Sequence, residues 1–262
     1  MQLLELYSPS DLAIIAGCTF AFSTAKGGFP AGIAAMPLLI LLWPDPENAA
    51  REAISYMLPL LVLMDICGFA FYRKRVNWKE LRPITVPTLV GVAIAGGILH
   101  LAIDSSASDR WLKLFTGVVG LSFVVYQAFR TRILKKIGKP ETPHPVWVWF
   151  CGTLAGLSST LCHIGGTAAQ AYYLSRPLEK MPLAATVVGF FLVLNAVKLI
   201  PYTLLDIFTK DILTLSAWMI PAVPLGVLAG YLATRALKPS SYVSLLYITM
   251  SVASIGLIIK AL

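Results

Sequence analysis

The sequence has few charges for its length. Of its 262 residues, 13% are Asp, Glu, Lys or Arg, whereas an ordinary soluble domain has about 25%. So few charged side chains cannot cover a surface that faces water, and this excludes a soluble enzyme. Hydrophobic residues make up 57% of the chain and the mean hydropathy is +0.76, which indicates a protein that lies mainly in lipid.

The sequence also offers little for metal, disulfide or catalytic chemistry. It has three histidines and four cysteines, and no two cysteines form a C-x-x-C pair, so neither a disulfide framework nor a zinc knuckle is indicated. It contains no H-E-x-x-H and no G-x-G-D motif, so the common intramembrane catalytic sets are missing. We therefore predict that the protein is not an enzyme and uses no metal or cofactor.

Long continuous apolar runs are what the chain does have. They cover residues 11–25, 29–43, 50–72, 83–103, 110–130, 146–161, 167–175, 182–205, 212–235 and 242–260. A transmembrane β-barrel would show shorter segments of alternating polarity instead. The runs predict an all-α polytopic membrane protein.

The charge of the linkers between the runs predicts the orientation of the chain. Lys and Arg gather in some linkers, at 73–82, 130–139, 176–180 and 235–238, and acidic residues in others, at 45–47, 104–109 and 206–211. Basic linkers face the cytoplasm. With that rule, the first two runs form a hairpin that starts and ends outside, and runs 146–161 and 167–175 form one that starts and ends inside. Their arms reach at most about 24 Å, less than the roughly 30 Å hydrocarbon core, so we predict two re-entrant hairpins entering from opposite faces.

Similar glycine pairs mark the two predicted hairpin tips. Gly27-Gly28 and Gly165-Gly166 lie 138 residues apart, and about three longer runs follow each pair. We predict two inverted repeats, residues 1–135 and 146–262, joined by a cytoplasmic linker at 136–145. Secondary transporters with this architecture hold their substrate near the midplane, between broken helices. The alternative is that the glycines only allow close packing of helices.

Buried cations and helix ends predict an anion site. A helix that begins after a glycine pair directs free N–H groups and the positive end of its dipole at the break, which favours an anion. Lys198 lies deep in run 182–205, where an ionised lysine costs about 2.5–3.5 kcal/mol. Asn195 and Tyr202 share its helical face. Lys26 at the first predicted tip is a second candidate buried cation. The alternative for both lysines is that the side chain extends to the membrane surface.

Further polar residues complete the candidate site. Asp65, inside run 50–72, either pairs with a lysine or carries a coupling proton. His163 is predicted to donate to the anion or to make a structural hydrogen bond, in preference to binding a metal. Three more side chains are candidate donors: Ser159, Thr160 and Gln170. The alternative for the hydroxyl groups is that they bond to carbonyls of their own helix.

Four motifs, in chain order, resemble the sulfite exporter TauE/SafE family. They are Lys26-Gly27-Gly28-Phe29, Leu58-Pro59-Leu60-Leu61 leading to Asp65, the segment 156–166, and Asn195-x-x-Lys198-x-x-Pro201-Tyr202. The resemblance covers nearly the whole chain and implies a multi-pass protein of the bacterial inner membrane, with two homologous halves, that moves small sulfur-containing anions. The chain departs from many members, which carry a third glycine where Phe29 and Thr167 stand and a glycine in place of His163.

We therefore predict a secondary transporter, working as an exporter, of small sulfur oxyanions such as sulfite or short organosulfonates, by alternating access around a midplane site. The predicted substrate-binding residues are Lys26, Gly27, Gly28, Ser159, Thr160, His163, Gly165, Gly166, Gln170, Asn195, Lys198 and Tyr202, with Asp65 for pairing or coupling. The predicted partners are a small anion and the lipid bilayer, not nucleic acid, and a homodimer is left open. The alternatives are a channel or a cation or metal carrier and, further behind, an intramembrane enzyme.

Overall fold

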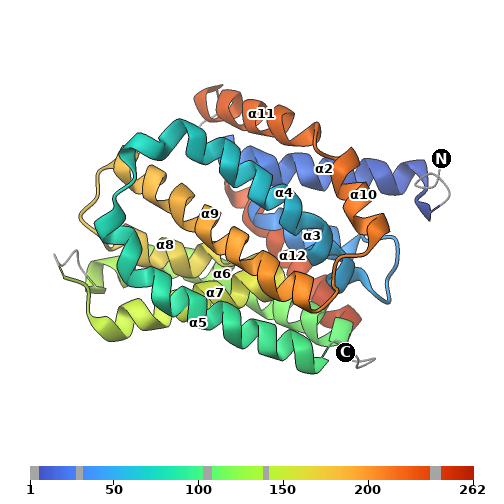
Figure 1. Ribbon diagram of the computed structural model, residues 1–262, viewed down its shortest axis with the longest axis horizontal. Coiled ribbons are helices and arrows are strands. Elements are labelled where there is room, and N and C mark those ends of the chain that lie inside the picture. The colour runs from blue at the N-terminus through green and yellow to red at the C-terminus, as the bar shows by residue number, and fades with distance from the viewer. Residues whose placement is uncertain (1–5, 28–31, 103–107, 138–141, 237–242) are drawn as a thin grey trace. The chain divides into compact units, whose positions relative to one another are not determined.

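The computed structural model describes residues 6–27, 32–102, 108–137, 142–236 and 243–262, and within them the chain forms helices and no strand (Figure 1). The helices in chain order are α2 (Pro9–Thr24), η1 (Ala25–Gly27), α3 (Gly32–Leu41), α4 (Ala49–Tyr72), η2 (Arg73–Arg75), α5 (Trp78–Ala102), α6 (Ser108–Ile137), α7 (Pro145–Cys162), α8 (Gly166–Leu174), α9 (Lys180–Leu204), α10 (Lys210–Trp218), α11 (Ala222–Ala236) and α12 (Val243–Ala261).

Several of these helices are long and apolar enough to cross a membrane. In the described part of the chain five pass this test, at Ala49–Ala70, Trp78–Leu101, Ser108–Arg130, Pro145–Cys162 and Met181–Leu204, and α10 with α11 gives a sixth if the pair is one broken span. The prediction of an all-helical polytopic membrane protein is confirmed. Helix α7 has 18 residues and is longer than the predicted run 146–161. The two re-entrant hairpins stay a prediction.

The predicted run 212–235 forms two helices that are joined by a bend. The helix α10 ends at Trp218, α11 begins at Ala222, and the two are bent by 46°. Pro221 lies at this break and Pro224 in the first turn of α11, and neither has the backbone N–H that a continuous α-helix would use there. The two prolines were visible in the sequence and carried the signal for the bend.

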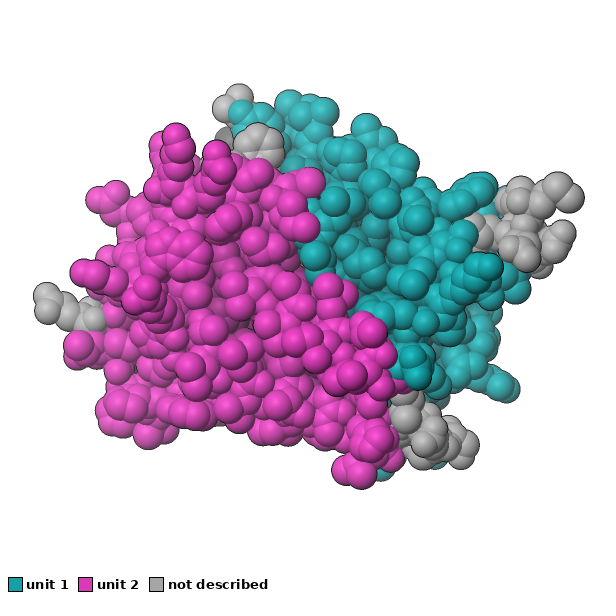
Figure 2. All heavy atoms as spheres, viewed as in Figure 1, with its two compact units in different colours: residues 1–64, 106–124, 206–262 teal, residues 65–105, 125–205 magenta. Residues whose placement is uncertain are grey.

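The chain divides into two compact units (Figure 2). Unit 1 comprises 1–64, 106–124 and 206–262, and unit 2 comprises 65–105 and 125–205. In unit 1, α2 packs against α3 and α11, while α12 packs against α3. In unit 2, α7 packs against α5 and α8, while α9 packs against α5. Each unit therefore draws segments from both predicted repeats, whose boundaries stay a prediction.

Glycines allow direct backbone contact between α5 and α7 in unit 2. A Cβ atom added at Gly91 would lie 2.2 Å from the Thr153 carbonyl oxygen, and one added at Gly156 would lie 2.1 Å from that of Thr88. Unit 1 has a similar contact between α2 and α11, where a Cβ atom at Gly230 would lie 2.2 Å from the Thr24 oxygen. Small residues let membrane helices approach this closely without side chains between them.

We expect Gly91→Ala to destabilise the protein by about 1–3 kcal/mol, because the added methyl group forces α5 away from α7. Thermal unfolding of the purified protein measures this effect. Gly97→Ala is the matched control on the same helix, since nothing lies within 4 Å of a Cβ atom there. It should leave stability unchanged or raise it by up to about 1 kcal/mol. Equal midpoints for the two variants would contradict the contact.

Candidate functional site

Polar side chains of unit 2 come together inside the protein from three helices. They are Asp65, on the part of α4 that belongs to unit 2, Ser159 on α7 and Lys198 on α9, and Asp65 and Lys198 are completely buried. A charged group in such surroundings is stable only when other groups replace the water it has lost. The hydrogen bonds of Lys198 show which groups do so.

The Lys198 ammonium has four polar neighbours. Its Nζ atom lies 3.0 Å from both the carbonyl oxygen and the Oγ atom of Ser159, 2.7 Å from Asn195 Oδ1 and 2.8 Å from His163 Nδ1. The ammonium is therefore held inside the protein against α7. The alternative that Lys198 extends to the membrane surface does not fit this arrangement.

Asn195 links the lysine to an acid on another helix. Its Nδ2 atom donates to Asp65 Oδ2 at 2.5 Å, while its Oδ1 atom accepts from Lys198. The amide thus bridges a buried carboxylate and a buried ammonium, whose opposite charges balance. This geometry fits the pairing role predicted for Asp65.

His163 ends α7 in an unusual backbone conformation. Its φ of 54° and ψ of 20° lie in the left-handed region, where histidine is one of the few enriched non-glycine residues. Its backbone N–H donates to the Ser159 carbonyl at 3.0 Å, and its Nδ1 atom lies 3.1 Å from the same oxygen. The ring stacks on Tyr202 with centroids 6.3 Å apart. The left-handed turn thus places the imidazole beside both Ser159 and Lys198.

The hydroxyl groups near the site have different roles. Ser158 donates to Leu154 O at 2.6 Å and Thr160 to Gly156 O at 2.8 Å, so the alternative that they bond to their own helix fits both residues. Ser159 differs because its Oγ atom accepts from Lys198. Tyr202 donates to the Thr160 carbonyl at 2.6 Å and is fully buried. In this state the Thr160 and Tyr202 hydroxyls are thus engaged within the protein.

The second hairpin tip lies close to α7. A Cβ atom at Gly165 would lie 2.5 Å from both the Ala155 oxygen and Ser159 Cβ, so close packing accounts for a glycine at this position. Gly166 begins α8, and Gln170 is half-buried farther along the same helix.

The first hairpin tip belongs to unit 1. Lys26 and Gly27 lie in η1, which packs against α11, and Lys26 is partly buried. Gly28 lies outside the described residues. The structure therefore brings together Asp65 and the predicted residues of α7 and α9, while the first tip is described only within its own unit.

The sequence did not predict the buried ion pair between Arg176 and Glu80 in unit 2, because Arg176 was expected only to be part of a basic linker. The Arg176 Nε atom lies 2.5 Å from Glu80 Oε2 and its Nη2 atom 3.1 Å from Oε1, and the arginine side chain is 2% exposed. The hydrogen bond to Glu80 raises the pKa of the Arg176 guanidinium above its usual value. A signal existed, because Glu80 is the one acid within the basic stretch 73–82.

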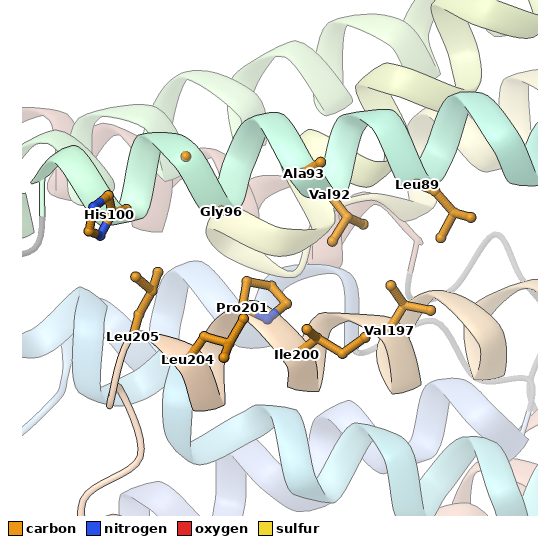
Figure 3. Close-up of a pocket in the computed structure, with 11 residues that line it drawn as sticks. Leu89, Val92, Ala93, Gly96, His100, Val197, Ile200, Pro201, Leu204 and Leu205 are labelled. Atoms are coloured by element: carbon orange, nitrogen blue, oxygen red, sulfur yellow. The ribbon is translucent and has the colours of Figure 1, made fainter.

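A pocket of about 390 Å³ between α5 and α9 lies apart from the polar cluster (Figure 3). Its lining is apolar except for His100, and none of the predicted site residues belongs to it. An oxyanion needs several N–H or O–H donors. The pocket does not offer them, so the cluster around Lys198 remains the candidate site.

Comparison with known proteins identifies the family. A search of curated proteins and a search of solved structures gave no match. The family model described as "Sulfite exporter TauE/SafE" matches residues 13–257 of the 262. Because the match covers almost the entire sequence, the chain belongs to the sulfite exporter TauE/SafE family of membrane transporters.

Proposed function

We propose that the protein is a secondary transporter that exports small sulfur oxyanions, such as sulfite or short organosulfonates, across the bacterial inner membrane, and that Lys198 binds the anion. The observation that carries this proposal is a completely buried lysine in a helix that is long and apolar enough to cross a membrane. Ionisable groups at this depth are costly and belong by default to substrate or ion pathways.

The neighbours of Lys198 favour an anion as the substrate. An ammonium has three protons, while four acceptor atoms lie around Nζ, so these atoms share the protons. An incoming oxyanion takes the place of one neutral acceptor and gains a charge-assisted hydrogen bond, which is stronger than a bond between neutral groups. Asp65 supplies one negative charge, which holds the empty site close to neutrality. A cation carrier would instead place several carboxylates here.

The order and packing of the helices support an alternating-access mechanism. Two short helices and then three longer segments occur twice: α2 to α6, and α7 to α12 with α10 and α11 as one segment. The first helix of each set packs on a helix of the other set, α7 on α5 and α2 on α11. In transporters built from two such repeats, one bundle moves against another around a fixed site.

We expect sulfite or a short sulfonate to raise the unfolding temperature of the detergent-purified protein. A ligand at about 100 times its Kd stabilises the folded state by about 2.7 kcal/mol. The test compares sulfite, sulfoacetate, isethionate, sulfate, acetate and chloride at matched ionic strength. A rise with sulfur oxyanions and none with chloride or acetate supports the proposal. A rise only with metal cations would favour a cation carrier instead.

A further inference from the structure

We propose that His163 couples anion binding to proton uptake. When an anion engages the Lys198 ammonium, the Nδ1 atom of His163 takes up one proton from the buffered solution, and the resulting imidazolium donates a hydrogen bond to the Ser159 carbonyl. The proton is then the coupling ion of the transporter. This inference rests on the function proposed above and adds a second ligand to the same site.

The Nδ1 atom has two neighbours that require opposite protonation states. Lys198 Nζ lies 2.8 Å away and Ser159 O 3.1 Å away. A ring nitrogen accepts a hydrogen bond when it carries no proton and donates one when it does. An ammonium is only a donor, so it requires a bare Nδ1 atom and a neutral ring. A carbonyl oxygen is only an acceptor, so it is the partner of a protonated Nδ1 atom. Both partners are already in position.

The Ser159 carbonyl oxygen cannot accept hydrogen bonds from all of its neighbours at once. Three nitrogen atoms lie near it: the backbone nitrogen of His163 at 3.0 Å, Lys198 Nζ at 3.0 Å and His163 Nδ1 at 3.1 Å. A carbonyl oxygen has two lone pairs. The backbone N–H occupies one in either state, and Lys198 and Nδ1 compete for the other. When an anion draws Lys198 away, the vacated lone pair accepts the new proton on His163.

The charges around His163 make its protonation depend on the bound anion. An ammonium and an imidazolium only 2.8 Å apart repel each other strongly in a buried site, and Asp65, acting through Asn195, balances only one of the two positive charges. A bound anion supplies the second negative charge. Protonation of His163 therefore becomes favourable when the site is occupied.

Two other titratable groups near His163 are engaged in hydrogen bonds. Tyr202 on α9 donates to the Thr160 carbonyl, and Cys162 on α7 donates to the Ser158 carbonyl at 3.1 Å. The packed helix α8 has no Asp, Glu, Lys, Arg or His in Gly166–Leu174. Lys198 and Asp65 are the charged neighbours from α9 and α4. Of these groups, His163 is the one whose titrating nitrogen lies within hydrogen-bond distance of both a donor and an acceptor.

The test counts the protons taken up for each anion bound. The full-length protein in detergent is titrated with isethionate and, separately, with sulfite in two buffers of different ionisation enthalpy, near pH 7.5. We expect the wild type to take up about one more proton per anion than His163→Asn, since one titrating group is removed. Comparing the two proteins cancels any protonation of the anion itself. Asparagine tolerates the left-handed backbone at this position. His100→Gln, in the apolar pocket, is the matched control and should keep wild-type uptake.

A second measurement uses the wild-type protein and does not depend on the folding of the variant. In protein labelled at histidine, the NMR signal of one of the three rings should change from neutral to imidazolium when isethionate or sulfite is added. Binding with no change in any ring, or equal uptake by wild type and His163→Asn, would overturn the coupling and leave the proposed function intact. If no sulfur oxyanion binds or changes the unfolding temperature, the proposed function fails, and the coupling fails with it.

Discussion

Lys198→Ala should reduce the flux of sulfite or isethionate into proteoliposomes to the background of empty vesicles. Contact with the ammonium replaces part of the water that the anion loses on binding. Without the ammonium, the site retains the negative charge of Asp65. A carboxylate without its cation repels an oxyanion, so the variant loses attraction and gains repulsion. We expect at least about a hundredfold loss of flux, since a charge-assisted bond of about 1.5–3 kcal/mol is replaced by an opposing charge.

The control for this prediction is Lys210→Ala. Lys210 is exposed at the start of α10, and its removal changes the net charge of the protein by the same amount. That variant should transport at the wild-type rate. Thermal unfolding confirms that both proteins are folded before their rates are compared. A folded Lys198→Ala variant that still transports would remove Lys198 from the site.

Asp65→Asn should destabilise the protein by about 3–5 kcal/mol, the usual cost of leaving one partner of a buried charge pair alone. The substitution removes the charge that Asn195 links to Lys198, so a buried ammonium remains without compensation. Unfolding of the purified protein by heat or denaturant measures the loss. Adding Lys198→Met to Asp65→Asn should restore most of the stability, because both charges are then absent, while transport remains lost.

Asp211→Asn is the matched control, because Asp211 is exposed in the first turn of α10. Its effect should stay within about 0.5 kcal/mol. An equally small effect of Asp65→Asn would mean that the Asp65 carboxyl carries no charge in the folded protein. If the double variant were less stable than Asp65→Asn alone, the two residues would not compensate each other.

Local spacing predicted the face of α9 that forms the cluster. Asn195, Lys198 and Tyr202 follow the three- and four-residue spacing of a helix, so their side chains had to gather on one side. The continuous apolar runs predicted the long helices for a similar reason, because lipid requires every backbone group to bond within its own segment. Periodicity and polarity are local properties, and the sequence displays them directly.

The partners of these residues depend on packing and could not be read from the sequence. Asp65 meets Asn195 across 130 positions of the chain, and no local pattern joins them. The role of the Ser159 main-chain oxygen could not be predicted either, since every residue has a carbonyl group and only the packed structure places this one beside the lysine. The ion pair of Glu80 with Arg176 likewise depends on how distant segments pack.

The backbone contact between α5 and α7 also has a mechanical consequence. Where a Cβ atom would lie 2.1 Å from a carbonyl of the facing helix, there are no rotamers to adjust and no soft layer to compress. At this contact α5 and α7 therefore behave as one rigid pair, and Ser159 lies on α7. Helix α9, which carries Lys198, contains Pro201, and a proline interrupts the ladder of helical hydrogen bonds where it stands. We therefore expect a movement that opens this cluster to bend α9 or to shift the tip at His163, with α5 and α7 moving together.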